Sequence, residues 1–421
     1  MTHTVHGAGI GTNWAGNHAY RALELVRPRT LEELSEVVAR SGRVRAIGSR
    51  HSFSDLTDTS GTLVDLAGLP HGIRVDPDAG TVSVGSAVRY AELALALQEQ
   101  GWALAAMASL PHISVAGAVA TGTHGSGDRV RSLAAAVRAL DVVGPDGEVR
   151  RLQRGEPDFD GSVVALGALG IVSRLELDVE PAYEMSQEVR TGLGWWDLER
   201  HFDDVTGAAY SVSIFTRSWE DVDQLWLKHR VGEERTADRF ATVAASGTLH
   251  MLAGGSEQAV TAQGGVPGPW LDRLPHFRTQ FTPSNGAELQ SEYFVAREAA
   301  LEAVAAVRHL APALRHLLLV SELRTVAADD LWLSGAQGRD TVALHFTWVR
   351  DEPAVRRVVR RLEEVLLPLG ARPHWGKVFE MDAGALAGAF PRLPDFVALR
   401  ARVDPARVFG NDFLDRALGR A

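Results

Sequence analysis

Acidic, basic and hydroxyl side chains recur in two segments of the C-terminal half that are otherwise apolar. Glu322 and Arg324 lie two positions apart, as do His345 and Thr347, so each pair shares one face of an extended chain. In residues 341–349 the alternate positions carry only Val, Leu, Phe and Trp, which is typical of a core-facing surface. Glu322 and Arg324 alone also fit a surface ion pair, but polar faces on strands this apolar indicate pocket walls that converge on a hydroxylated ligand.

A third group of chemically active side chains follows in the loop Pro373-His374-Trp375-Gly376-Lys377. It places an imidazole and an ammonium beside an indole on a constrained stretch of chain. Taken singly, a tryptophan is usually part of a core and a lysine usually faces solvent. Together with the two strands, the loop supplies an acid, proton acceptors, cations and a hydroxyl, which suits redox chemistry on an alcohol.

The N-terminal half holds two stretches that suit a flat or phosphorylated ligand. Residues 45–55 lead from a short apolar strand into a Gly- and Ser-marked bend that presents His51, although an ordinary strand-to-loop turn has the same pattern. Residues 107–127 contain four glycines and hardly a charge. Such chain exposes backbone N–H groups and lets a ligand approach closely, so we predict a ligand cradle here.

Secondary-structure signals place these groups on a mixed framework. Thr30 and Glu33 have the spacing of a capping box, which begins a helix that ends at Ser41. Further helices are predicted at 89–100, 298–310 and 355–365, and strands at 44–47, 63–66, 73–75, 81–84, 137–143, 148–152, 172–179, 317–325 and 341–349. This order lacks regular strand–helix alternation, and no G-x-G-x-x-G pattern follows a strand, so a Rossmann NAD domain is not expected. Side chains become longer and more aromatic after Glu184, which predicts a domain boundary near Pro181.

Composition sets the outer limits. The 421 residues suggest about two to three domains, and a hydrophobic content of 45% allows large cores. A net charge of −10 without a basic block argues against nucleic acid or an anionic membrane as a partner. The absence of cysteine excludes disulfides, thiolate catalysis, iron–sulfur clusters and cysteine-ligated zinc. Without a secretory signal or an apolar run approaching ~18 residues, a cytoplasmic protein is expected.

Several motifs, in order and at similar spacing, make the chain resemble a known family. They are Gly48-Ser49-Arg50-His51-Ser52, the run 109–127, Glu322-Leu323-Arg324, His345-Phe346-Thr347, Pro373-His374-Trp375-Gly376-Lys377, Asp404-Pro405 and Phe409-Gly410-Asn411-Asp412-Phe413. These motifs resemble the alditol oxidases, which are members of the vanillyl-alcohol-oxidase flavoprotein family and are related to the aldonolactone oxidases. The resemblance runs essentially from end to end, and several motifs in register are more specific than any one of them.

The resemblance implies an α+β, two-domain flavin-binding fold of the vanillyl-alcohol-oxidase/PCMH type. An FAD-binding domain would span 1–180, a substrate-binding domain built on an antiparallel sheet flanked by helices would span 181–380, and a C-terminal segment, 381–421, would return to the FAD domain. The implied reaction is oxidation of the terminal primary hydroxyl of alditols, such as xylitol and sorbitol, to the aldose by a monomeric enzyme, with O₂ reduced to hydrogen peroxide. Flavins accept a hydride from alcohols and pass the electrons to O₂.

The resemblance also implies roles for individual residues, none of them at a metal site. FAD would be attached covalently through His51, and the other cofactor-binding residues would be Ala46, Ile47, Gly48, Ser49, Arg50, Ser52, Ser109, Ser114, Gly117, Ala118, Val119, Ala120, Ile171 and His374. The polyol would be bound by Ser109, Glu322, Arg324, Thr347 and Lys377. Catalysis would use Glu322, Arg324, His345 and Lys377, of which the cations can stabilise negative charge and either His345 or Lys377 can accept the hydroxyl proton.

Arg50 departs from the pattern of the family, because many relatives carry glycine immediately before the linking histidine. We expect its side chain to point away from the flavin, or toward a phosphate or the solvent. We also expect a backbone angle that a non-glycine residue tolerates.

Other functions are alternatives to the alditol oxidase interpretation. The nearest is a related flavin oxidase or dehydrogenase that acts on an aldonolactone or another hydroxylated substrate. A non-catalytic flavin- or sugar-binding protein is more remote. A metal-dependent hydrolase using His51, His112 and His124 has no ligand spacing to support it.

Overall fold

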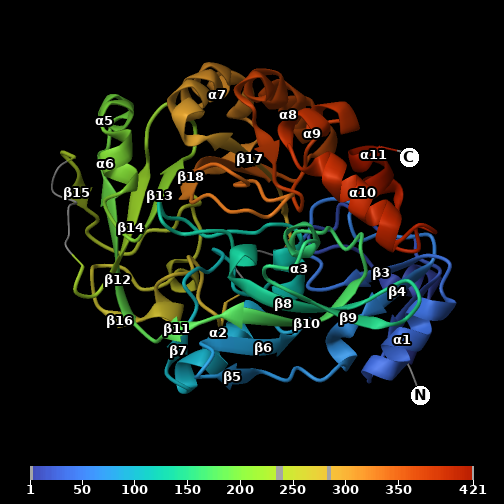
Figure 1. The fold of residues 1–421 in the computed structure, drawn as a ribbon. Helices are drawn as coiled ribbons and strands as arrows, with labels where there is room; N and C mark the ends of the chain where they lie inside the picture. Colours follow the sequence, from blue (N-terminus) through green and yellow to red (C-terminus); the bar gives the residue numbers. More distant parts are fainter. Residues whose placement is uncertain (1–2, 234–239, 282–285, 420–421) are drawn as a thin grey trace.

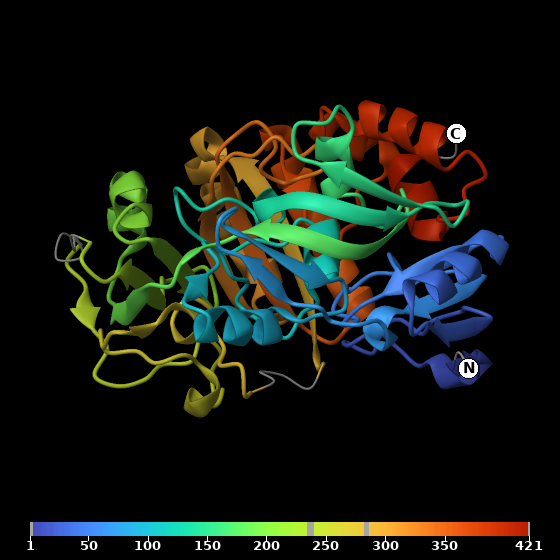
Figure 2. The ribbon, with the colours of Figure 1, turned by 60° about the horizontal axis from the view of Figure 1, so that its bottom comes forward.

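The computed structural model describes residues 3–233, 240–281 and 286–419. Two sheets formed by the N-terminal part of the chain lie beside one large sheet formed by the later part, and helices cover the outer face of the large sheet (Figure 1). The same arrangement is visible from below in Figure 2, where the small N-terminal sheet and the large sheet lie on opposite sides of the central antiparallel sheet. The architecture is α+β, as the sequence predicts.

The first sheet has the order β1-β2-β4-β3, in which β2, β4 and β3 are parallel and β1 is antiparallel to β2. Its strands are β1 (His3–His6), β2 (Glu24–Arg27), β3 (Val44–Ile47) and β4 (Thr62–Asp65), with helix α1 (Leu31–Arg40) between β2 and β3. The hydroxyl of Thr30 accepts the N–H of Glu33 at 3.2 Å, and the Glu33 carboxylate accepts the N–H of Arg29 at 2.9 Å. The predicted helix start is therefore confirmed, and its end at the cap residue Ser41 is confirmed as well.

The second sheet is antiparallel throughout, with the order β5-β6-β10-β8-β9. Its strands are β5 (Arg74–Asp76), β6 (Thr81–Gly85), β8 (Val137–Val143), β9 (Val149–Gln153) and β10 (Ile171–Asp178). The strand pairs β5–β6 and β8–β9 each form an antiparallel hairpin, and the turn between β8 and β9 closes with the N–H of Gly147 donating to the carbonyl of Gly144 at 2.9 Å. Helices α2 (Tyr90–Glu99), α3 (Val115–Ala120) and α4 (Phe159–Val163) and the short pair β7 (Trp102–Ala103) and β11 (Glu180–Pro181) complete this region.

The third sheet has the order β15-β12-β14-β13-β18-β19-β17-β20, with β16 also paired to β12. Its strands are β12 (Glu184–Thr191), β13 (Ser211–Thr216), β14 (Gln224–Arg230), β15 (Val243–Ala244), β16 (Gly268–Pro269), β17 (Glu288–Ala296), β18 (Leu318–Val326), β19 (Thr341–Val349) and β20 (Arg372–Pro373). The helices of this region are α5 (Trp195–Arg200), α6 (Phe202–Thr206), α7 (Ala300–Leu314) and α8 (Glu352–Leu366). The helix expected at 298–310 begins two residues later, because residues 297–299 form a 3-10 turn.

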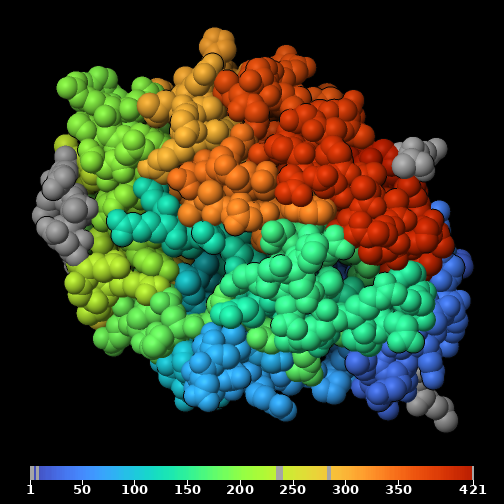
Figure 3. All heavy atoms as spheres, in the orientation of Figure 1, coloured from blue at the N-terminus to red at the C-terminus, as the bar shows by residue number. Residues whose placement is uncertain are grey.

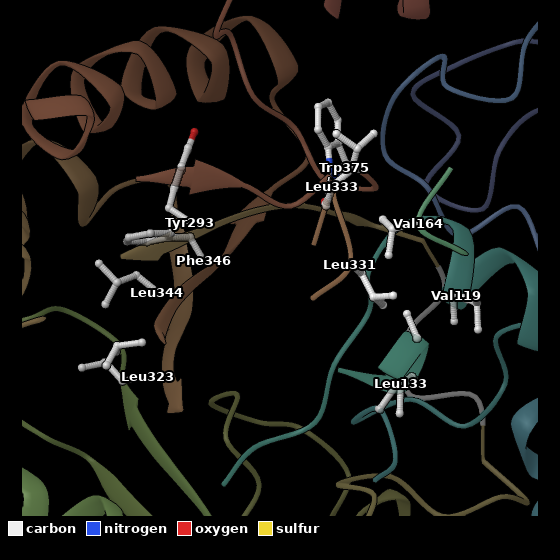
Figure 4. Close-up of a cluster of buried hydrophobic side chains, with 14 of the residues drawn as sticks. Val119, Leu133, Val164, Tyr293, Leu323, Leu331, Leu333, Leu344, Phe346 and Trp375 are labelled. Atoms are coloured by element: carbon white, nitrogen blue, oxygen red, sulfur yellow. Dashed lines mark hydrogen bonds between the residues drawn. The ribbon is translucent and has the colours of Figure 1, made fainter. Parts of the chain in front are cut away.

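The two faces of this sheet differ in chemistry, as the period-two pattern of β19 predicts. Leu344 and Phe346 lie with Tyr293 and Leu323 in the core (Figure 4), where α7 and α8 cover the sheet. The opposite face carries the polar side chains of the same strands and points toward the N-terminal sheets. The sheet is therefore a wall with an apolar back and a polar front.

The last helices, α9 (Ala383–Ala389), α10 (Leu393–Val403) and α11 (Asp412–Leu418), return to the N-terminal part of the chain. The side-chain amide of Asn411 donates to the carbonyls of Leu56 at 2.8 Å and Asp58 at 2.9 Å. The buried guanidinium of Arg45 donates to the carbonyl of Phe409 at 3.0 Å. In Figure 3 this C-terminal segment (red) lies against the N-terminal residues (blue) at one edge of the molecule. None of the described helices is long and apolar enough to cross a bilayer.

Candidate active site

A cavity lies between the polar front of the third sheet and the N-terminal sheets. Its walls include the predicted residues Ala46, Ile47, Gly48, Ser49, Arg50, His51, Ser52, Ser109, Ser114, Gly117, Ala118, Ala120, Ile171, Glu322, Arg324, His345, Thr347, His374 and Lys377. Folding therefore brings together residues that the sequence places in six separate segments.

Val119 is the exception and corrects the prediction. The glycine-rich run was expected to act as a backbone cradle, but residues 115–120 form helix α3, so successive side chains point in different directions. Gly117, Ala118 and Ala120 line the cavity, whereas Val119 is 2% exposed and packs in the core near Leu133 (Figure 4).

The bend before His51 and the start of α3 are held together by their serines. The N–H of Ser114 donates to the hydroxyl of Ser49 at 3.1 Å, and the N–H of Ser49 lies 3.4 Å from the hydroxyl of Ser114. A Cβ atom on Gly48 would lie 2.2 Å from the Ser114 hydroxyl, so this close crossing requires glycine. The two stretches of the predicted cradle thus form one surface.

His51 lies in the cavity wall with its imidazole stacked on the indole of Trp14, at a ring-centre distance of 5.0 Å and an interplanar angle of 23°. Both ring nitrogens are buried, and neither has a hydrogen-bond partner in the described part of the chain. Burial lowers the pKa of His51 to about 4, so the ring is neutral near pH 7. A buried imidazole with no partner is unusual and indicates a missing ligand.

Arg50 lines the cavity and also contacts the N-terminal residues. Its guanidinium donates to the carbonyl of Ile10 at 2.8 Å and lies 5.4 Å from the ring centre of Tyr20. Its φ angle is 61°, in the left-handed region that favours glycine, so the expectation of an ordinary backbone angle is wrong. The contacts with Ile10 and Tyr20 hold the arginine in this conformation.

Arg324 is the centre of the polar face. Its guanidinium donates to the carboxylate of Glu292 and lies 3.4 Å from the hydroxyl of Ser109. Its Nε lies 3.5 Å from a carboxylate oxygen of Glu322. Burial acts against ionisation of Glu322, but the positive charge of Arg324 holds the pKa of that carboxyl well below its usual range. The face therefore presents an oriented cation flanked by carboxylates.

Glu292 also fixes two imidazoles. Its Oε1 lies 3.1 Å from Nε2 of His124, and its Oε2 lies 3.5 Å from Nδ1 of His345. Nε2 of His345 lies 3.2 Å from the hydroxyl of Thr347. Burial opposes ionisation of Glu292, but Arg324 and His124 together hold its pKa well below the usual value. Burial lowers the pKa of His345, so this ring is neutral near pH 7.

The loop 373–377 places His374 and Lys377 in the cavity wall and Trp375 in the core. The Lys377 ammonium donates to the side-chain carbonyl of Gln290, and burial lowers the pKa of Lys377 to about 8. His374 is buried, accepts the N–H of Gly376 at Nδ1 at 3.1 Å, and has its pKa held well below 6.5 by burial. Trp375 instead packs in the core behind the sheet (Figure 4).

Sequence reasoning missed Glu292 and its neighbour Gln290, which both line the cavity. They lie on β17, where Glu288, Gln290 and Glu292 alternate with Leu289 and Ser291. The signal is the same period-two polarity that identified His345 and Thr347, so it was available in the sequence. Buried Lys228 and His276, which lie behind Glu322, were missed as well.

The cavity fits a cofactor with a flat ring system and polar edges. Small side chains of Gly117, Ala118 and Ala120 border it along α3, and the Ser86 hydroxyl and the His51 nitrogens are buried there without protein partners among the described residues. No group of three or more His, Asp or Glu side chains in the described ranges could hold a metal ion.

Comparison with known proteins agrees with this geometry. Residues 22–153 match the family model described as an FAD binding domain, and residues 285–417 match the model of D-arabinono-1,4-lactone oxidase. The crystal structure of cholesterol oxidase from Brevibacterium sterolicum has the same fold, with a TM-score of 0.79 over 99% of this chain and 97% of that chain, at 14% sequence identity. The two family matches and the cavity therefore define an FAD-dependent oxidoreductase.

Two curated relatives narrow this class. The chain is 51% identical to an alditol oxidase from Streptomyces sp., over 96% of this chain and 97% of that protein. It is 31% identical to the L-gulono-1,4-lactone dehydrogenase of Mycobacterium tuberculosis, over 97% of this chain and 99% of that protein. The chain belongs to the alditol oxidase family.

Proposed function

We propose that the protein oxidises the terminal primary hydroxyl of alditols such as xylitol and sorbitol to the aldose, with O₂ reduced to hydrogen peroxide. The observation that carries this proposal is the polar face of the third sheet, where Ser109, Glu322, Arg324, Thr347 and Lys377 converge on one cavity that His51 also lines. A site that can form hydrogen bonds with several hydroxyls favours a polyol and discriminates against analogues that lack them. The 51% identity to an alditol oxidase supports the same substrate class.

We assign substrate binding to the side chains whose polar atoms remain available on the cavity side. Glu322 accepts a hydroxyl proton in a hydrogen bond, while Ser109 and Thr347 can donate or accept. Arg324, held by Glu292, places positive charge where the alcohol oxygen becomes electron-rich. When bound, FAD supplies the acceptor for the hydride and the route for the electrons to O₂.

We assign the proton acceptor to His345 rather than Lys377. Glu292 lies 3.5 Å from Nδ1 of His345, which favours the tautomer with the proton on Nδ1. Nε2 then carries the lone pair, which accepts from the Thr347 hydroxyl at 3.2 Å until a substrate hydroxyl takes its place. A lysine with a pKa of about 8 is mostly protonated at pH 7 and acts there as a cation and donor. His345 is neutral at the same pH and is therefore the better base.

We further propose that His51 carries the FAD covalently. A neutral imidazole with an unshared lone pair is the nucleophile that such a bond requires, and Trp14 stacks on the ring and fixes its plane. The contacts of the C-terminal helices with Leu56 and Asp58 support a division into an FAD domain at 1–180, a substrate domain at 181–380 and a returning segment at 381–421. The family resemblance is the support for a monomeric enzyme, and we take the cytoplasm as its compartment.

One absorption spectrum tests the reaction. The purified protein should show an oxidised flavin spectrum that bleaches when xylitol is added without oxygen, and admitting O₂ should restore the colour and yield peroxide. The second candidate is oxidation of an aldonolactone, which the match of residues 285–417 to the D-arabinono-1,4-lactone oxidase model favours. Bleaching by L-gulono-1,4-lactone but not by xylitol or sorbitol would replace the first proposal with the second.

A further inference from the structure

Lys228 is a buried cation on a strand whose neighbours are apolar. It lies on β14, in the sequence Gln-Leu-Trp-Leu-Lys-His-Arg, and is 1% exposed. Its ammonium nitrogen lies 2.7 Å from the carbonyl of Leu274, 2.9 Å from the carbonyl of Pro275 and 3.0 Å from Nδ1 of His276. The side chain is therefore surrounded by three potential acceptors and by no carboxylate in direct contact among the described residues.

His276 connects this lysine to the active site. Its Nε2 lies 2.8 Å from Oε1 of Glu322, and its ring makes edge contacts with Phe215 and Trp226 at centre distances of 5.6 and 5.1 Å. The backbone N–H of His276 donates to the carbonyl of Ser109 at 3.1 Å. The loop that carries His276 thus touches two residues that we assign to substrate binding.

The number of protons on Lys228, His276 and Glu322 determines which of these groups donates and which accepts in each hydrogen bond. The two carbonyls can only accept, so Lys228 must donate to both of them. Burial lowers the pKa of Lys228 well below its usual value, and the negative charge of Glu322 acts against this shift. In the ammonium form the lysine has one further proton for Nδ1 of His276. His276 then carries its own proton on Nε2 and donates it to Glu322. A neutral lysine would need a proton on Nδ1, which leaves three arrangements at Nε2. An unprotonated Nε2 would face the Glu322 carboxylate at 2.8 Å with only the more distant Ser213 hydroxyl, at 3.4 Å, as a donor. A protonated Glu322 could donate to Nε2, but the charge of Arg324 holds the pKa of that carboxyl well below its usual range. The third arrangement is a buried imidazolium. Burial and the neighbouring lysine lower the pKa of His276 to about 4, which disfavours the imidazolium.

We propose that Lys228 and His276 are positioning residues that hold Glu322 as an ionised acceptor aimed at a hydroxyl of the substrate. Lys228 selects the tautomer of His276, and His276 in turn occupies one carboxylate oxygen of Glu322. The other oxygen lies 3.5 Å from Nε of Arg324. The carboxylate therefore cannot rotate without breaking the buried hydrogen bond from His276, which is costly, and the charge of Arg324 opposes its protonation. The role of Glu322 as an acceptor for a substrate hydroxyl rests on the proposed function. The direction of the hydrogen bonds from Lys228 to His276 and from His276 to Glu322 does not.

The direction of the hydrogen bonds between Lys228, His276 and Glu322 can be tested in the holoenzyme without turnover. Two-bond ¹H–¹⁵N spectra of protein labelled with ¹⁵N-histidine distinguish the two neutral tautomers, and the His276 signal is identified by its loss in His276→Gln. We expect the tautomer with the proton on Nε2 in the wild type. In Lys228→Met the Glu322 carboxylate still faces Nε2, but the lysine charge no longer opposes protonation of Nδ1, so the pKa of His276 should rise. A proton on Nδ1 in the wild type, or an unchanged pKa of His276 in Lys228→Met, would overturn the proposal.

The effect on substrate binding is tested by a matched pair of substitutions at position 276, His276→Gln and His276→Leu. Glutamine at 276 can accept from Lys228 through its carbonyl and donate to Glu322 through its NH₂, whereas leucine can do neither. We expect His276→Leu and Lys228→Met to raise KM for xylitol at least about tenfold, the effect of losing one oriented hydrogen bond. Their kcat should change less, and His276→Gln should remain within about threefold of the wild type.

The outcomes separate this proposal from its alternatives. If Lys228 only anchors the loop at Leu274 and Pro275, His276→Gln and His276→Leu will be equally impaired, which contradicts the proposal. If Lys228→Met does not fold, the comparison of His276→Gln with His276→Leu still distinguishes positioning of Glu322 from anchoring of the loop. A wild-type protein that oxidises no polyol refutes the proposed function. The tautomer measurement still tests the hydrogen bonds from Lys228 through His276 to Glu322.

Discussion

The guanidinium of Arg324 on β18 donates to the carboxylate of Glu292 on β17, across the intervening strand β19. The two side chains are 7% and 1% exposed. Removing one partner of such a buried pair leaves an uncompensated charge, which commonly costs about 3 to 5 kcal/mol. Glu292 therefore has both a structural role and an influence on the reacting groups around it.

Glu292→Gln should lower the free energy of unfolding by about 3 kcal/mol, because the amide cannot compensate the charge of Arg324. It should also lower kcat, since the amide no longer favours the proton on Nδ1 of His345. Thermal unfolding and steady-state kinetics with xylitol measure the two effects. Glu363→Gln is the matched control, because burial raises the pKa of Glu363 to about 7 and this residue contacts Tyr293 in the core rather than the cavity. Equal loss of kcat in both variants would contradict the assigned role of Glu292.

The pH dependence of kcat/KM should identify the base. Burial lowers the pKa of His345 below 6.5, so the neutral ring is lost as the pH falls through that lower value, and the rate should fall with it. Lys377, with a pKa of about 8, loses its charge as the pH rises through that value, so a second decline should begin there. His345→Gln should remove the acid limb and Lys377→Met the alkaline limb. A rate that instead rises through pH 8, and no longer does so in Lys377→Met, would make Lys377 the base.

Attachment of the flavin at His51 can be read from precipitated protein. The acid-precipitated wild type should give a yellow, fluorescent pellet, and His51→Ala a colourless one, because no other unpartnered imidazole stacks on Trp14 among the described residues. His112→Ala is the control, since His112 lines no part of the cavity and its Nε2 lies 3.0 Å from the carbonyl of Thr279. A yellow pellet from His51→Ala would place the attachment elsewhere.

Residue pattern predicted most of this site, and its failures have physical causes. The polar front and apolar back of β19 follow from a period of two, because one residue of shift would turn His345 into the apolar core and Phe346 toward the cavity. Val119 was misassigned because a short helix interrupts the glycine-rich run and turns that side chain into the core. Lys228 gave no signal, since its role depends on the loop at Leu274, which reaches it only in three dimensions.

The backbone at Arg50 is the feature that residue identity predicts least, because left-handed φ angles are uncommon for arginine. Two substitutions separate the strain from the side-chain contacts. Arg50→Ala and Arg50→Gly both lose the hydrogen bond to Ile10 and the contact with Tyr20, but only glycine adopts a φ of 61° without strain.

The glycine variant should therefore exceed the alanine variant in free energy of unfolding by about 1 kcal/mol, the usual cost of this conformation for a residue with a Cβ. Denaturant unfolding of the two holoenzymes measures the difference. A variant in which the bend shifts should also bind flavin more weakly or attach it more slowly than the wild type, because the backbone carbonyl of residue 50 accepts the N–H of Trp14 at 2.8 Å and so positions the ring that stacks on His51. Equal stability of the two variants would mean that the bend relaxes once the arginine is gone, and that Ile10 and Tyr20 impose the angle.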